Sequence, residues 1–214
     1  MASKWLLWQL ADSAFPAGAL AHSGGLEAAM QLGLVRDRDS LREFVVTILQ
    51  QSHRGVAVFL NRVWLEPDAF EKQDRECDLF LNSSIANRAS RSQGQAFLAT
   101  AARTFDVQEL RQRAIDVRRM KLPCHFSPII GWIGQCLSMP RESTLELFAF
   151  FTARSCLSSA VRLGVIGPLE AQHMLATLSP PLEIDPSADP VQIAPVLDLV
   201  QSTQDRLYSR LFQS

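Results

Sequence analysis

Residues 40 to 65 read SLREFVVTILQQSHRGVAVFLNRVWL, and this stretch decides the fold class. Its apolar residues recur at steps of three and four, the spacing that lines one face of an α-helix. Ser40 followed by Glu43 has the form of a capping box, and Pro67 stops the pattern. We therefore predict a helical segment that buries one face, formed by Leu41, Phe44, Val45, Ile48, Leu49, Val56, Phe59, Leu60 and Val63.

The rest of the chain repeats this helical spacing, and no stretch alternates in the manner of a β-strand. Four prolines between residues 180 and 190 mark a loop, whereas Pro168 and Pro195 stand where a first helical turn accepts proline. We predict an all-α fold, a single domain over residues 1–214 with about eight to ten helices. The further helical segments run over 68–82, 84–103, 106–120, 129–137, 144–163 and 168–178, and Pro123 and Pro128 break the chain before the segment at 129–137. The last helix begins at Pro195, and one of its faces carries Val196, Leu199, Val200, Thr203, Leu207 and Leu211.

The composition excludes several classes of protein. Of 214 residues, 47% are apolar and 20% charged, which rules out a disordered chain. The net charge of −1 means that the chain has no overall positive charge with which to bind nucleic acid or an anionic membrane. Because a charge near zero gives little repulsion between molecules, it favours self-association or binding to a partner. The apolar run from Trp5 to Trp8 is too short for a signal peptide, and none reaches the roughly 18 residues of a membrane span. We expect a soluble, cytoplasmic protein.

Charge is distributed unevenly along the chain. Residues 163–205 hold six acids and no lysine or arginine, which also disfavours a membrane-surface amphipathic protein. The middle of the chain is basic instead. The asymmetry is typical of two differently solvated faces, and it also fits complementary docking surfaces for different partners. Between residues 82 and 121 the eight basic residues are Arg88, Arg91, Arg103, Arg111, Arg113, Arg118, Arg119 and Lys121, against Asp106, Glu109 and Asp116.

The segment from Leu10 to Glu27, LADSAFPAGALAHSGGLE, interrupts the helical pattern between two apolar helices. It brings Asp12, Ser13, His22 and Ser23 together, so a helical hydrolase using Ser23 and His22 is the alternative from another functional class. A Gly-x-Ser-x-Gly elbow and a phosphate-binding Gly-Lys-Ser/Thr ending are both missing. The favoured interpretation is a structured turn, capped by aspartate and serine and shaped by glycines.

Cysteine and histidine predict no metal site, no cofactor and no catalytic residue. Cys77, Cys124, Cys136 and Cys156 lie far apart and are typical of reduced, buried cysteines. No two histidines stand four residues apart as on a metal-binding helix. The neighbours Cys124 and His125 point apart on a helix, so a transient nickel or zinc contact there is the weaker alternative to a helix start.

The C-terminal residues QDRLYSRLFQS, from Gln204 to Ser214, present four apolar or aromatic side chains. Chain ends fray unless they are docked. Two interpretations remain open, a helix folded back onto its own core and a protein interface, where aromatic and arginine side chains are enriched. The four side chains are Leu207, Tyr208, Leu211 and Phe212.

Four blocks of this sequence resemble those of the UreF family of urease accessory proteins. They are the segment from Leu10 to Glu27, Ser92-Gln-Gly-Gln95, His125-Phe-Ser-Pro-Ile-Ile-Gly131 and Leu207-Tyr-Ser-Arg-Leu-Phe-Gln-Ser214. The sequence departs from the family pattern in two places. Residues 160–172 lack a complete Pro-Leu-Gly-Gln run, and Gln204 stands where histidine is commoner in the family. The resemblance implies an all-α homodimeric scaffold without chemistry of its own.

The resemblance also implies partners. Such a protein binds the accessory protein UreD (also called UreH) and recruits the GTPase UreG to apo-urease, where GTP hydrolysis accompanies nickel delivery. By analogy, the UreD-type contact falls on Tyr208, Arg210, Leu211 and Phe212. The G-protein-facing or dimer-proximal surface falls on His22, Ser23, Gly24, Gly25, Arg91, Gln93 and Gly94.

Overall fold

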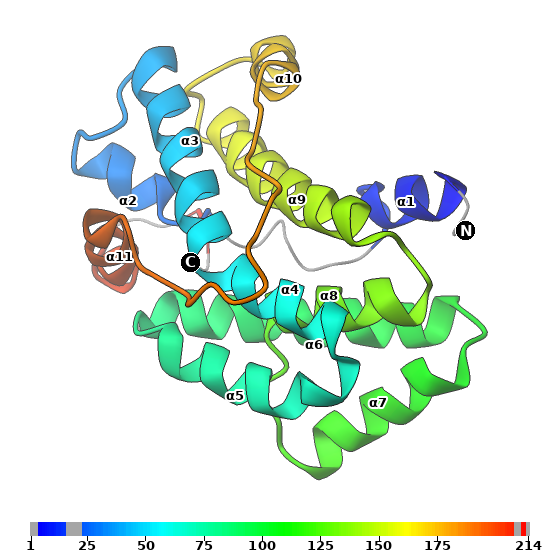
Figure 1. Cartoon of the computed structure of the whole chain (residues 1–214). Coiled ribbons are helices and arrows are strands. Elements are labelled where there is room, and N and C mark those ends of the chain that lie inside the picture. Colours follow the sequence, from blue (N-terminus) through cyan, green and yellow to red (C-terminus); the bar gives the residue numbers. More distant parts are fainter. Residues whose placement is uncertain (1–3, 16–22, 208–210, 213–214) are drawn as a thin grey trace.

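The structure is a computed structural model, and it describes residues 4–15, 23–207 and 211–212. These residues form eleven α-helices and two short 3₁₀ helices and contain no β-strand, so the predicted all-α class is confirmed (Figure 1). The helices are α1 Lys4–Ala11, α2 Leu26–Gln31, α3 Arg38–Arg54, α4 Val56–Leu65, η2 Pro67–Ala69, α5 Phe70–Phe80, α6 Ser84–Thr104, α7 Gln108–Arg119, α8 Phe126–Cys136, α9 Arg141–Arg162, α10 Pro168–Ala176, α11 Pro195–Ser202 and η3 Gln204–Arg206.

Helix α8 lies at the centre, packed against α4, α5, α6, α7 and α9. It is apolar on every side, and residues 126–134 are all buried, as expected of a helix surrounded by others. Close approach depends on glycine. A Cβ on Gly131 would lie 2.3 Å from the carbonyl oxygen of Leu60 in α4, and one on Gly94 in α6 would lie 2.0 Å from that of Cys124. The glycines in two of the motif blocks therefore serve helix packing.

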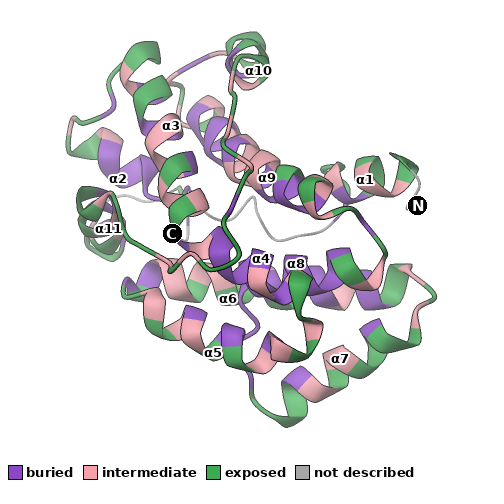
Figure 2. Cartoon of the chain, viewed as in Figure 1, coloured by how far each residue is buried: buried purple, intermediate pink, exposed green. Residues whose placement is uncertain are grey.

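The buried side chains form two hydrophobic clusters, and α9 belongs to both. Its first half, with Leu145, Phe148 and Phe151, packs into the cluster built around α4, α6 and α8. Its second half, with Cys156 and Leu157, packs into the cluster of α2, α3, α10 and α11. Figure 2 shows the corresponding buried band along α4, α8 and α9. The long helix α9 thus connects the two parts of the core.

The predicted segment over 40–65 is divided, which raises the helix number above the expected eight to ten. Gly55 lies between α3 and α4 with φ −106° and ψ −100°, outside helical values. The capping box also starts earlier than Ser40. Asp37 is the N-cap of α3 and accepts a hydrogen bond from the Ser40 backbone N–H at 2.9 Å, while the Ser40 hydroxyl accepts one from the Asp37 N–H at 3.1 Å. The prediction of Ser40 and Glu43 as the box was wrong.

Two other predictions about proline and the last helix need correction. Pro128 does not break the chain, because it stands in the first turn of α8, where its missing N–H has no helical partner. The last helix begins at Pro195 as predicted but ends at Ser202, short of Leu207 and Leu211. Its buried face carries Leu197 and Val200, while Val196 and Leu199 are exposed.

No helix in the described part of the chain is both long and apolar enough for a membrane span.

Candidate functional site

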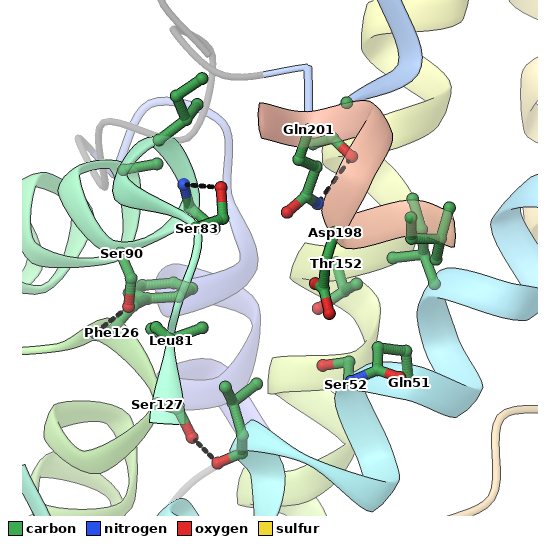
Figure 3. A pocket seen from close by; sticks show the side chains of 18 of the residues that line it. Gln51, Ser52, Leu81, Ser83, Ser90, Phe126, Ser127, Thr152, Asp198 and Gln201 are labelled. Atoms are coloured by element: carbon green, nitrogen blue, oxygen red, sulfur yellow. Dashed lines mark hydrogen bonds between the residues drawn. The ribbon is translucent and has the colours of Figure 1, made fainter. Parts of the chain in front are cut away.

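A cavity of about 240 Å³ opens between α3, α6, α9 and α11, and we call it the α11 pocket. Its walls are mainly apolar, with polar groups placed around them. Figure 3 shows side chains from α3, α9 and α11 on one side of the cavity and those of residues 81–90 and the start of α8 on the other. The polar lining includes Ser23, Gln51, Ser52, Ser83, Ser90, Gln93, Thr152, Asp198 and Gln201. An apolar cavity with a few polar groups is the usual form of a ligand- or side-chain-binding site.

Hydrogen bonds hold α11 over this pocket. The side-chain oxygen of Gln51 in α3 accepts from the backbone N–H groups of Ile193 and Ala194, at 2.6 and 2.8 Å, just before the helix begins. At its other end, Gln201 Nε2 donates to the Gly24 carbonyl at 3.0 Å. Gly25, with φ +88°, leaves the room that this contact needs, since a Cβ there would lie 2.6 Å from Gln201 Cγ. The N-terminal motif therefore forms one edge of the pocket.

Two polar groups in the α11 pocket have unusual surroundings. The Ser23 hydroxyl is buried and has no hydrogen-bond partner among the described residues. Burial raises the pKa of Asp198 above its ordinary value. Among the described residues, the pocket is lined by Ser23 and Asp198 but by no histidine. His22, the histidine of the hydrolase alternative, lies outside the described residues. Ser13 is exposed and does not line this pocket, and the Asp12 side chain accepts from the Ala14 N–H at 2.8 Å, a local turn.

The C-terminal segment docks on the N-terminal motif through Glu27, a contact that we call the C-terminal clasp. Glu27 is 4% exposed. One oxygen of its carboxylate accepts from the Leu211 N–H at 2.6 Å, and the other accepts from Gln204 Nε2 at 2.7 Å and from the Phe212 N–H at 3.2 Å. A buried carboxylate is stable only with such donors. The first and last motif blocks therefore meet in space.

The clasp gives the two terminal apolar side chains different positions. Phe212 is 4% exposed and lies under the Arg162 guanidinium, whose Cζ is 4.4 Å from the ring centroid. Leu211 remains 53% exposed. Leu211 and Phe212 thus fold back on the chain, as one of the two interpretations has it, and the last helical turn in the described part of the chain, η3, ends at Arg206.

A second buried polar cluster surrounds the start of α8, and we call it the His125 cluster. The Asp74 carboxylate accepts from the backbone N–H groups of Cys124 and His125, both at 2.7 Å. The His125 ring is fully buried, with Nε2 3.0 Å from Asp78 Oδ1 and Nδ1 3.1 Å from Ser90 Oγ. Because a carboxylate only accepts, Nε2 carries the proton. Both ring nitrogens are therefore engaged by protein groups.

This arrangement explains the direction of the pKa shifts in the cluster. Burial lowers the pKa of His125 below 6.5 and raises that of the Cys124 thiol, so neither favours its charged form. Burial also acts to raise the pKa of Asp78, but hydrogen bonds from Asn87 and His125 outweigh it and lower that pKa overall. Among the described residues, no group of three His, Cys, Asp or Glu side chains is placed to hold a metal ion. The cluster fastens the start of α8 to α5 and α6.

The His125 cluster predicts how stability depends on pH. Because the folded-state pKa of His125 lies below 6.5, the unfolded chain binds the proton more readily. Its contribution is therefore fully present above pH 6.5 and is lost as the pH falls through the folded-state value. Between pH 7.5 and 5.5, we expect the free energy of unfolding to decrease, by at most about 1.4 kcal/mol per pH unit for this group.

Urea unfolding of the wild type, His125→Gln and His173→Gln at both pH values measures this contribution. The pKa of His53 is also lowered by burial, so part of the slope persists in every variant. His125→Gln should flatten the dependence, whereas His173→Gln, which alters an exposed residue of α10, should not. Equal slopes in all three proteins would contradict the assignment.

The structure separates the residues expected at the G-protein-facing surface. Ser23, Gly24, Gly25 and Gln93 all line the α11 pocket. Arg91 lies on another side of α6, where it lines a different cavity. The other expected residues are Gly94, which is buried against Cys124, and His22, Tyr208 and Arg210, which lie outside the described residues.

Sequence reasoning missed Glu27, Asp198 and Gln201 as parts of the site. Glu27 carries the one available signal, because it is an acid within a helix whose neighbours Leu26, Ala28 and Ala29 are apolar. Asp198 and Gln201 carry none, since polar residues are ordinary on a short helix at the protein surface, and their partial burial comes from the tertiary packing of α11.

Together, the fold, the α11 pocket and the clasp define an all-helical protein in which residues 23–25 form one edge of a cavity and Glu27 binds the C-terminal residues Leu211 and Phe212. A family model described as UreF matches residues 35–179. "Urease accessory protein F" of Oryza sativa subsp. indica is 35% identical over 98% of this chain and 85% of its own length. The protein of that name in Arabidopsis thaliana is 32% identical over 99% and 92%. "Urease accessory protein UreF" of Trichodesmium erythraeum is 27% identical over 96% and 94%. The chain belongs to the UreF family.

Proposed function

We propose that this protein is a urease accessory scaffold for nickel insertion, acting in the cytoplasm as a homodimer and without catalysis of its own. With a UreD/UreH-type protein, it recruits a UreG-type GTPase to apo-urease and couples or regulates GTP hydrolysis during nickel delivery. The names of the relatives support the role in urease maturation. The single observation that carries the scaffold role is the C-terminal clasp, because it fixes Leu211 and Phe212 while the Leu211 side chain remains exposed.

The clasp supports a UreD-type contact at the C-terminal segment. Glu27 binds the backbone N–H groups of Leu211 and Phe212, and the Phe212 ring packs under Arg162, so these two residues lose little further freedom when a partner binds. Leu211 then offers an exposed apolar side chain of the kind that becomes buried at the centre of an interface. Tyr208 and Arg210 extend this proposed surface along the sequence.

The edge of the α11 pocket supports a second contact, with the G-protein. Gly24 is exposed there, and Gln93 is partly exposed on α6 across the cavity. Because α11 is tied to Gly24 through Gln201, a partner at this edge also contacts the helix that covers the pocket. We place the G-protein-facing surface on residues 22–25 with Gln93.

The experiment is co-purification of this chain with the UreD-type protein and the UreG-type GTPase. Leu211→Ser should weaken binding of the UreD-type protein by about tenfold, the loss expected for one apolar side chain removed from an interface. Leu169→Ser is the matched control, since Leu169 is another exposed leucine, 86% exposed on α10, and is not part of the clasp. The double variant His22→Ala, Gln93→Ala should instead reduce GTPase recruitment. Normal recovery of both partners in all variants would reject these contacts.

A further inference from the structure

A second cavity, of about 330 Å³, lies between α6 and α7 beside the turn that follows α7, and we call it the α6–α7 pocket. Both helices are labelled in Figure 1. Its floor consists of buried apolar side chains, including Leu98, Val117 and Leu122. Its exposed rim carries Gln95 and three cations, Arg91 from α6, Arg118 from α7 and Lys121 from the turn. None of these cations belongs to the clasp or the α11 pocket.

The positive charge of this pocket is only partly compensated by nearby acids. Among the described residues, no acidic side chain lines it. Two acids of the α7 region pair with cations outside the pocket: Asp116 with Arg119 at 2.8 Å and Asp106 with Arg111 at 2.6 Å. Asp78 acts on Arg91 from the side of the His125 cluster, where it also binds His125. Three cations around one concavity repel one another and attract a multivalent anion.

The turn that carries Lys121 has an unusual backbone conformation. Lys121 has φ +53° and Cys124 has φ +60°, a left-handed conformation that is uncommon for residues other than glycine. The turn is closed by the bond from the Leu122 N–H to the Val117 carbonyl at 3.0 Å. It is pinned to α6 by the contact of Gly94 with the Cys124 carbonyl. A left-handed residue with this hydrogen bond is a common way for an α-helix to end, and it gives Lys121 a fixed position at the rim of the pocket.

We propose that the α6–α7 pocket binds a phosphoryl dianion, with Arg91, Arg118 and Lys121 as its ligands. A tetrahedral dianion has enough oxygens and charge for two guanidinium groups and an ammonium group, whereas a single carboxylate compensates only one of the three charges. The apolar floor leaves room for the organic part of a phosphate ester. The site is separate from the partner contacts proposed above.

Calorimetric titration of the whole chain at low ionic strength tests this assignment with three probes, namely inorganic phosphate, adenosine 5′-monophosphate and citrate. We expect saturable binding of phosphate or the nucleotide with a dissociation constant of about 1 mM or below. Tighter binding of the nucleotide identifies an organic phosphate as the source, and equal binding identifies free phosphate. Both results support the site. No saturable binding, or citrate binding as tightly as the phosphate probes, overturns it.

The double variant Arg118→Gln, Lys121→Gln should weaken phosphate binding by at least about tenfold, because it removes two charge-assisted ligands. The matched control, Arg111→Gln, Arg119→Gln, removes the same charge from the same part of the chain outside the pocket and should leave the affinity unchanged. Equal losses in the two variants would show a diffuse electrostatic effect and overturn the proposal. Co-purification with the urease-maturation partners should stay normal in the pocket variant, so the scaffold role is tested separately.

Discussion

Replacement of Gly94 by alanine is expected to lower the free energy of unfolding by about 3 kcal/mol, although alanine normally stabilises a helix interior by about 0.5–1 kcal/mol relative to glycine. The added Cβ would lie 2.0 Å from the Cys124 carbonyl oxygen and 2.8 Å from the His125 carbonyl carbon. Both are backbone atoms and cannot rotate away. α6 must therefore move off the turn, which also loosens the hydrogen bonds of the His125 cluster.

Chemical denaturation of the Gly94→Ala protein measures this loss, with Gly167→Ala as the control. Gly167 has φ −79°, and an added Cβ there meets only the Glu170 side chain at 3.8 Å, an ordinary contact. The control should stay within about 1 kcal/mol of the wild type. A Gly94→Ala protein as stable as the wild type would mean that α6 and the 124–125 backbone are not in direct contact.

The second large effect is expected for Glu27→Gln, which keeps the size of the side chain but replaces one acceptor oxygen by an NH₂ donor. That donor would face the Leu211 N–H or the donors Gln204 Nε2 and Phe212 N–H, according to its orientation. A hydrogen bond to a charged group contributes about 1.5–3 kcal/mol, so we expect a loss of about 3 kcal/mol. The C-terminal segment should detach, and binding of the UreD-type partner should weaken with it.

Hydrogen exchange resolves this effect residue by residue. In the wild type, the Leu211 and Phe212 amides should exchange slowly, and in Glu27→Gln they should exchange at rates close to those of an open chain. Glu43→Gln, on the exposed face of α3, is the control and should change neither amide. Slow exchange of both amides in Glu27→Gln would refute the clasp.

The fold class could be predicted from sequence because its signals are local. Apolar spacing found most helices, and the proline rule placed the starts of α10 and α11 at Pro168 and Pro195. The division of α3 from α4 at Gly55 was not visible in this way. A Cβ on Gly55 would lie 2.9 Å from the Gln51 carbonyl and 3.0 Å from the ring of Phe80, and the second contact is tertiary. Periodicity alone carries no information about such a neighbour.

The site was predictable only where it coincided with a motif. Ser23, Gly24 and Gly25 were singled out because glycine and polar residues interrupt a helical pattern, and they line the α11 pocket. Residues two apart on a helix point in different directions, so Arg91 and Gln93 face different cavities although they are neighbours in sequence. The residues after α11 dock through hydrogen bonds to Glu27, which lies 177 residues before Gln204 and 184 before Leu211 in the sequence. Patterns among neighbouring residues carry no information about contacts between such distant positions.

The clasp also has a consequence for biosynthesis. The Glu27 carboxylate is synthesised 184 residues before the Leu211 amide that it binds. Domains begin to fold during translation, N-terminal parts first, so the Glu27 carboxylate in α2 lacks these hydrogen-bond donors until Gln204, Leu211 and Phe212 have been made. A nascent chain that stops before Gln204 keeps a carboxylate that cannot be buried without donors. Only a chain synthesised through Phe212 can form all three hydrogen bonds to Glu27. The clasp therefore stabilises the native state only after the chain has been synthesised as far as Phe212.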